Sequence, residues 1–138
     1  MINKHQHACI FIENLFYILI VTLTIIRYPK FFTPFALMMM AIFRLPLYLH
    51  KNVSFFKLLG CGQNGTFDKT PDWRQWGILT ADKRGQALLK LPANDLLKHL
   101  YGNFISKWLR FFNCECWTVV LEPIEGHGSW DGQKPFGP

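Results

Sequence analysis

The chain has 138 residues, a mass of 16.2 kDa and a formal charge of +6 at pH 7. This length suits one domain, and we expect a single packed domain over residues 15–138 behind a poorly ordered N-terminus, 1–14. Half of the residues are apolar and only 17% are charged, which argues against a disordered chain or a coiled coil. The basic residues are scattered singly or in pairs, without the basic stripe typical of a nucleic-acid surface. We therefore expect no nucleic-acid partner.

The four cysteines, Cys9, Cys61, Cys114 and Cys116, occur without a secretory signal or a dense disulfide framework. This favours a reducing compartment and hence the cytoplasm. On a strand, Cys114 and Cys116 would share a face, where they could hold a soft metal together with Cys61 or His127. Two small apolar residues on a core-facing strand explain the spacing equally well, and we expect no metal site.

The apolar stretch 8–26 has two interpretations. One is a membrane anchor, but Glu13 and Asn14 interrupt the stretch and leave too few apolar residues to cross a bilayer. The other is a strand buried on both faces, which fits the β-branched run over 18–26. We predict a strand over 15–27, with a membrane-anchored protein as the alternative.

Proline positions set the bounds of the next element. Pro34 suits the first turn of a helix over 35–43, with Thr33 as its N-cap. The residue before Pro46 is disfavoured in helical geometry, so we expect this helix to end at Leu45.

Periodicity predicts the remaining elements. These are strands over 53–59 and 75–80, which we expect to pair, helices over 84–90 and 94–108, and a last strand over 115–121. The order strand, helix, strand, strand, helix, strand is that of a ferredoxin-like α+β unit, with an antiparallel sheet covered by helices on one face.

The densest group of functional side chains lies between Glu122 and Gly132. His127 can transfer a proton or serve as a nitrogen ligand, and Asp131 can act beside it as an acid or base. Trp130 and Phe136 offer flat apolar surface for a substrate. The alternative is a tight loop in which polar side chains bond their own backbone.

Several separate blocks resemble the spheroidene monooxygenase family of carotenoid-modifying enzymes and its bacterial relatives. The blocks are VTLTIIRYP at 21–29, FFKLLGCG at 55–62, PD at 71–72 with WGIL at 76–79, PIEGHGSWDG at 123–132 and PFG at 135–137. They recur in the same order as in that family, over about 17–138.

The resemblance implies a dimeric α+β barrel and oxygenase chemistry, with haem as cofactor, on a carotenoid or another apolar substrate. His127 is the haem ligand it suggests, because it is the one histidine within a matching block. Arg27, in the first block, is a candidate substrate-binding residue. An enzyme for a lipid-soluble substrate would also make loose, peripheral contact with a membrane.

Members of the family continue for about another hundred residues. We therefore expect this chain to match their N-terminal half, with an incomplete sheet and little activity of its own. Such a sheet would pair through its exposed edges, or the chain would form homo-oligomers. The alternative from a different class is a small-ligand binding or structural module that has the fold without the chemistry.

Overall fold

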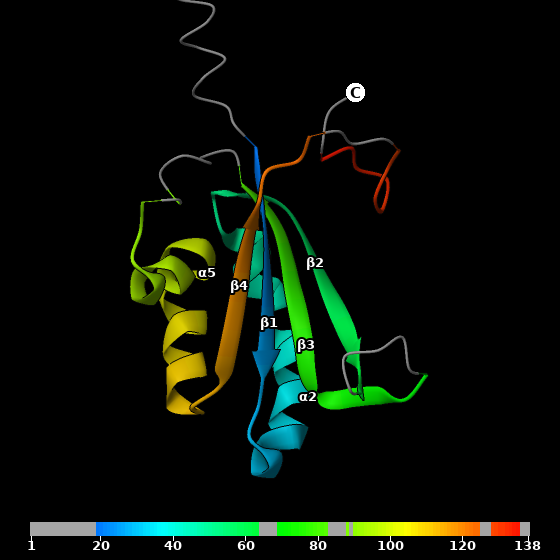
Figure 1. The fold of residues 1–138 in the computed structure, drawn as a ribbon, viewed down its shortest axis with the longest axis vertical. Helices are drawn as coiled ribbons and strands as arrows, with labels where there is room; N and C mark the ends of the chain where they lie inside the picture. The colour runs from blue at the N-terminus through cyan, green and yellow to red at the C-terminus, as the bar shows by residue number, and fades with distance from the viewer. Residues whose placement is uncertain (1–18, 64–68, 83–87, 89, 125–127, 136–138) are drawn as a thin grey trace, which may run out of the picture.

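The computed structural model describes residues 19–63, 69–82, 88, 90–124 and 128–135. The elements in chain order are β1 (Ile20–Arg27), the 3-10 turn η1 (Lys30–Phe32), α2 (Thr33–Ile42), α3 (Arg44–Leu49), β2 (Val53–Gly62), β3 (Pro71–Asp82), α5 (Ala93–Phe111) and β4 (Glu115–Leu121) (Figure 1). The predicted N-terminal segment 1–14 lies outside the described residues, as does most of the predicted helix 84–90.

The four strands form one open sheet in the order β2-β3-β1-β4, and every neighbouring pair is antiparallel. The predicted α+β class is confirmed, as is the predicted pairing of β2 with β3. The β-branched run became the central strand: β1 pairs with β3 on one side and β4 on the other. Residues 20–26 are therefore in a sheet, which contradicts a membrane helix through them.

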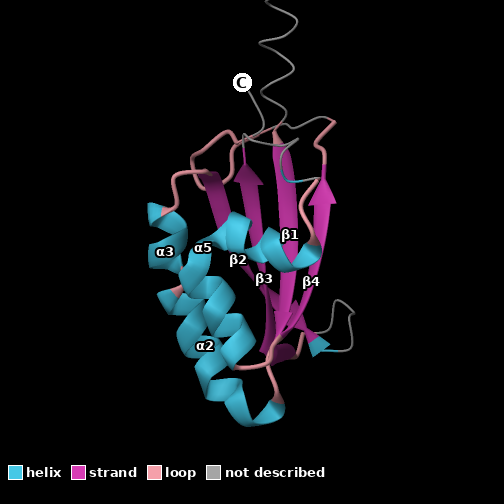
Figure 2. Ribbon diagram, turned by 90° about the vertical axis from the view of Figure 1, so that its left-hand side faces the viewer, coloured by secondary structure: helices cyan, strands magenta, loops and turns pink. Residues whose placement is uncertain are grey.

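The helices cover one face of this sheet, and no helix of the described residues lies on the other face (Figure 2). Because side chains alternate along a strand, every second residue of β1 points to the helices, and Ile26 is fully buried there. From the helix layer, Ala36, Met39, Phe43 and Leu47 form a buried stripe at helical spacing. Phe43 meets Trp76 of β3 edge to face, with ring centroids 5.5 Å apart.

A polar network crosses the buried side of the sheet. Thr22 of β1 and Thr80 of β3 share a hydrogen bond of 2.6 Å. The hydroxyl of Thr24 lies 2.5 Å from the Tyr101 hydroxyl of α5 and 3.0 Å from the Thr118 hydroxyl of β4. Burial raises the pKa of Tyr101 to about 12, so the phenol stays protonated. The network ties three strands to α5 without leaving these hydroxyls unpaired.

The predicted bounds of the first helix were wrong at both ends. Thr33 is inside α2, and its hydroxyl donates to the Lys30 carbonyl oxygen at 2.9 Å, closing the preceding turn instead of capping the helix. The chain also remains helical past Pro46, because a new helix, α3, begins at Arg44. Pro46 is thereby placed in the first turn of α3, where its missing N–H removes no hydrogen bond.

The strands β2 and β3 are longer than predicted. The glycine-rich segment 60–62, beyond the predicted end of the strand at 59, continues β2 through a register shift opposite β3. Glycine tolerates the irregular backbone that such a bulge requires. The predicted helix over 94–108 is present as α5, but it bends at Gly102, where φ is 86° and ψ is 176°.

Candidate functional site

The open face of the sheet is an apolar floor. The strand register places alternate residues of all four strands in rows on this face. The three rows are Phe55, Ala81, Val21 and Leu121; Lys57, Leu79, Leu23 and Val119; and Leu59, Gly77, Ile25 and Trp117. Lys57 is the one charged side chain among them. We refer to these twelve residues as the open sheet face.

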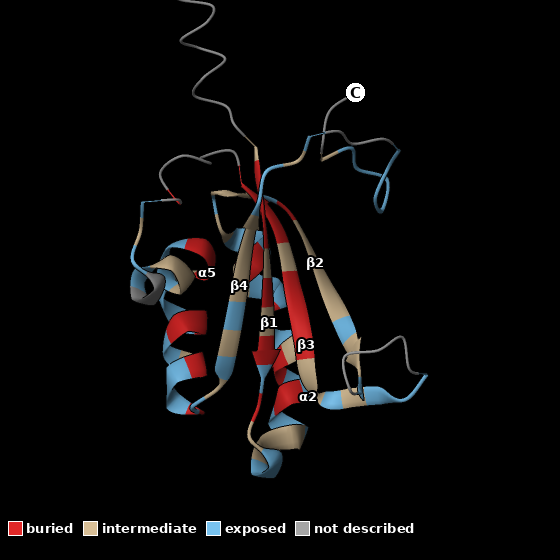
Figure 3. Cartoon of the chain, in the orientation of Figure 1, coloured by how far each residue is buried: buried red, intermediate tan, exposed pale blue. Residues whose placement is uncertain are grey.

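The open sheet face is most accessible on the edge strand β4, whereas Phe55, Ala81 and Val21 in its first row are buried (Figure 3). Trp117 is 63% exposed and Leu121 is 47% exposed, both on the edge strand β4. Gly77 lies in the middle of this face, where a larger side chain would be crowded, since a Cβ there would lie 3.1 Å from Ile25 Cδ1. Beyond the third row, Arg27 aligns with Gln75 and Glu115 and forms a polar border. Apolar surface of this kind with one polar end suits an extended apolar ligand or a second apolar surface.

A short hairpin from the C-terminal segment packs at the β2 end of this face. Trp130 and Gln133 exchange two backbone hydrogen bonds of 2.7 and 2.9 Å around Asp131 and Gly132. Both central residues have positive φ, 51° and 79°, as in the tight hairpin turn that an Asp-Gly pair favours. Residues 130–133 thus form a tight turn, but its hydrogen bonds join backbone atoms, whereas the loop interpretation expected polar side chains to bond their own backbone.

The hairpin touches β2 through both candidate side chains. The Trp130 ring meets Phe55 edge to face, with centroids 6.4 Å apart. Lys57 Nζ lies 3.3 Å from Asp131 Oδ2 and 5.7 Å from the centroid of the Trp130 ring. A hollow of about 400 Å³ opens beside these groups at the β2 edge. Its lining comprises Leu47, Tyr48, Val53, Ser54, Phe55, Phe56, Asp131 and Gln133.

The structure brings together only part of the predicted site. Trp130 and Asp131 are adjacent to the open sheet face, as a substrate site would require. Arg27 is at the far end of β1. Val21 shares a row with Phe55, and Arg27 lies six residues after Val21, about 20 Å away along the strand. His127 and Phe136 lie outside the described residues. Lys57 and Phe55 are members of the site that sequence reasoning missed, because only the fold brings them to a hairpin more than seventy residues later.

Of the described cysteines, Cys61 lies apart from Cys114 and Cys116. Cys61 ends β2 at one edge of the sheet, whereas Cys116 is in β4 at the other, three strand spacings or about 14 Å away. Burial raises the pKa of Cys114 to about 12 and of Cys116 to about 11, which keeps both as thiols. Within the described residues, no three metal-ligating side chains gather.

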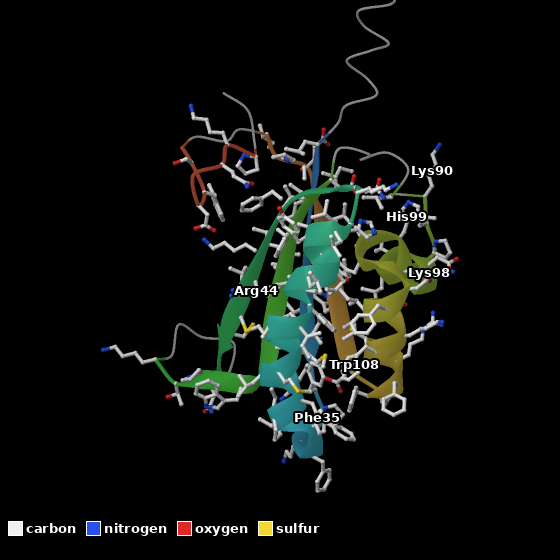
Figure 4. The ribbon with its side chains drawn as sticks, turned by 180° about the vertical axis from the view of Figure 1, so that it is seen from behind. Phe35, Arg44, Lys90, Lys98, His99 and Trp108 are labelled. Atoms are coloured by element: carbon white, nitrogen blue, oxygen red, sulfur yellow. The ribbon has the colours of Figure 1, made fainter. Side chains whose placement is uncertain are left out.

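A second hollow, of about 540 Å³, lies at the bend of α5. His50, Asp95, Lys98, His99 and Asn103 line it together with Asn52, Leu91 and Gly102, and Figure 4 shows Lys98 and His99 side by side on α5. Two histidines, His50 and His99, are among these lining residues. They lie on the helix side of the sheet, away from Trp130 and Asp131.

Two known proteins resemble this chain over most of its length. The spheroidene monooxygenase of Cereibacter sphaeroides is 28% identical over 119 residues, which are 86% of this chain. The spheroidene monooxygenase of Rhodobacter capsulatus is 30% identical over 105 residues, or 76% of this chain. The predicted resemblance to the spheroidene monooxygenase family is confirmed. The aligned regions span 34% and 40% of those two spheroidene monooxygenases. No protein-family model matches the chain.

The haem implied by the family fits the open sheet face in part. The apolar rows offer a flat surface for a porphyrin, but a haem iron also needs an axial ligand such as a histidine, tyrosine or cysteine thiolate. Among the described residues, His50, His99 and Tyr101 belong to the helix side, and Tyr28 is fully buried in the core. Tyr48 is exposed and lines the hollow beside Asp131 at the β2 edge. The described part of the chain therefore supplies a floor for haem, with the Tyr48 hydroxyl as a side-chain donor of an axial type beside it.

Proposed function

We propose that this chain is an oxygenase-like protein that binds an extended apolar substrate of the carotenoid class on its open sheet face. The observation that carries this proposal is the similarity to two spheroidene monooxygenases, together with the apolar rows described above. The chain spans about a third to two-fifths of those proteins, so activity and substrate are part of the proposal.

The dimensions of the open sheet face support a long ligand. The eight residues of β1 extend about 27 Å, and apolar side chains from β3 and β4 flank them along three rows. A polyene lying along β1 would bury apolar surface on both partners, at roughly 25 cal/mol for each Å² removed from water. Arg27 and Glu115 at the polar border would then face a hydroxyl or keto end of the ligand.

The hairpin gives the proposed site its polar chemistry. In this proposal Trp130 covers the ligand from the β2 side, and the Asp131 carboxylate, held by Lys57, accepts a hydrogen bond or a proton at the mouth of the hollow. Haem, when bound, would supply oxygen activation, and His127 is the proposed axial ligand. Within the described residues the role left to the protein is to bind the substrate, orient it and exclude water.

A second candidate function is ligand binding without turnover. The floor and the Lys57–Asp131 pair suffice to hold an apolar molecule, and both belong to the described part of the chain. His127, the proposed axial ligand, does not, so the described residues support ligand binding more directly than oxygen activation.

We also propose that two copies pair through the open sheet face, as in the dimeric barrel that the family resemblance implies. Trp117 and Leu121 would be covered by such pairing, and the substrate would then lie between the two sheets. Pairing through the free edges of β2 and β4 is the other arrangement for a homo-oligomer.

Titration of the purified chain with an acyclic carotenoid, with and without haemin, tests these proposals. The oxygenase-like function predicts a Soret band, and a keto product when oxygen and an electron donor are added, both lost in His127→Ala. Carotenoid binding without product in either case would establish the binding module. If neither carotenoid nor haemin binds, the proposal is wrong.

A further inference from the structure

The outer surface of the helix layer is a second apolar surface, on the opposite side of the protein from the open sheet face. Met38, Ile42, Leu45 and Leu49 follow each other at intervals of four, three and four residues. This spacing keeps them on one side of α2 and α3. Their side chains are 45%, 40%, 65% and 66% exposed. We call these four residues the outer stripe.

The outer stripe runs back to back with the buried stripe of the same helices. Ala36, Met39, Phe43 and Leu47 are each at most 2% exposed and hold α2 and α3 on the sheet. A helix that is apolar all round is normally covered on every side, in a large core or a membrane. Here one side is covered by the protein, and Phe31, 92% exposed, extends the apolar surface beyond the outer stripe.

The charged side chains of the helix segment itself have one sign. Lys30, Arg44 and Lys51 are exposed, and Figure 4 shows Arg44 on the side of this helix layer. No ion pair to any of them occurs within the described residues. The sequence has no Asp or Glu between Glu13 and Asp68, and the nearby acids, Asp131 and Asp95, line the two hollows at the end of α3. An apolar stripe on a segment that carries only cations is complementary to an anionic lipid surface.

The segment Lys30–Leu49 is long and apolar enough to span a membrane, but its packing opposes spanning. Crossing would remove the buried stripe from the core, and the helix is divided at Phe43 with Pro46 shortly after it. A helix pair that is half packed on a sheet can instead lie flat in the interface with its outer side in the lipid.

We propose that the outer stripe docks this protein on the surface of an anionic phospholipid bilayer, with Lys30, Arg44 and Lys51 contacting the headgroups. A partner helix could also use an apolar stripe with this spacing. The three cations, and the absence of Asp and Glu from the helix segment itself, favour the lipid surface, because binding to another helix does not require charges of a single sign. The proposal does not depend on oxygenase activity, since it concerns the opposite side of the sheet.

Flotation of the full chain with vesicles tests this proposal. Vesicles of equal parts phosphatidylglycerol and phosphatidylcholine are compared with vesicles of phosphatidylcholine alone. One variant carries Met38→Gln, Leu45→Gln and Leu49→Gln, and a second carries Lys30→Gln, Arg44→Gln and Lys51→Gln. The control variant carries Trp117→Gln and Leu121→Gln, which removes exposed apolar side chains from the open sheet face.

The proposal predicts binding to the anionic vesicles, weakened at least roughly tenfold by the apolar variant and about fivefold for each cation removed. The control variant should bind like the original chain. Thermal unfolding should be similar for all variants, because every substituted side chain is exposed. Equal binding by the apolar variant, or greater loss in the control variant, would overturn the proposal. So would a chain that ignores vesicles but forms oligomers that the apolar variant dissociates.

Discussion

Lys57 Nζ lies 3.3 Å from Asp131 Oδ2 and thereby joins the edge strand of the sheet to the C-terminal hairpin. The pair is partly exposed, at 37% for the lysine side chain and 68% for the aspartate. Its contribution to global stability is therefore below about 1 kcal/mol. Its structural effect is local, because it holds Trp130 against Phe55 beside the open sheet face.

Asp131→Asn should loosen the hairpin without unfolding the protein. Asparagine accepts the positive φ of 51° at this position, so the substitution removes the charge and keeps the turn. Hydrogen exchange should become faster over 128–135 and stay unchanged in β1. High salt should produce the same change in the original chain. Lys134→Gln serves as the control, and an equal effect from it would show that the Lys57–Asp131 pair is not the cause.

Tyr101→Phe should destabilise the fold by about 1–2 kcal/mol, because it leaves the Thr24 hydroxyl with one partner fewer in the core. Urea unfolding measures this change. Tyr48→Phe, at a residue that is 79% exposed, should have almost no effect. A double-mutant cycle with Thr24→Val tests the contact itself: additive losses would mean that the two hydroxyls do not interact.

Gly102→Ala distinguishes a bent α5 from a continuous helix. In a regular helix this substitution would stabilise by about 1 kcal/mol. At φ 86° a side chain is strained, so we expect a loss of about 1–3 kcal/mol instead. Gly60→Ala is the matched control, since a Cβ there meets open space and φ is not positive. A more stable Gly102→Ala variant would contradict the bend.

The buried thiols predict a loss of stability in alkali. Burial raises the pKa of Cys114 to about 12 and of Cys116 to about 11, from 9.0 in the unfolded chain. Because the folded pKa values are the higher ones, the unfolded chain releases these protons first. The stabilisation is therefore complete below pH 9 and declines as the pH rises toward 11 and 12. The variant Cys114→Ala with Cys116→Ala should show a flatter decline in urea unfolding between pH 8 and about 10.5. An unchanged slope would argue that the thiols are not buried.

Local pattern was sufficient for much of the fold. The β-branched run 20–26 predicted a strand buried on both faces. The strand is confirmed, and β3 and β4 flank it within the sheet, but the described helices cover one face only, and Leu23 and Ile25 on the other face are partly exposed. The predicted end of the first helix was wrong because a proline is compatible with two backbone arrangements. Pro46 can end one helix or begin the next, and only the packing of Leu47 into the core decides for α3.

The site was less predictable, because it depends on contacts between distant parts of the chain. The composition of the C-terminal loop identified Trp130 and Asp131, but nothing in the sequence pairs them with Lys57 and Phe55. Arg27 was grouped with them through the family resemblance, whereas the strand register places it at the opposite end of β1. The open sheet face itself can be read from alternation only after the register of all four strands is known.

The central claim is that the open sheet face binds an extended apolar ligand, and carotenoid titration of two exposed-site variants tests it most directly. Trp117→Gln removes an aromatic side chain from that face, and Phe111→Gln removes one that is 81% exposed on α5. Affinity is measured from the shift of the carotenoid absorption bands. We predict that Trp117→Gln weakens binding by about tenfold and that Phe111→Gln leaves it unchanged. Equal affinity for Trp117→Gln and the original chain, or a loss confined to Phe111→Gln, would contradict the account.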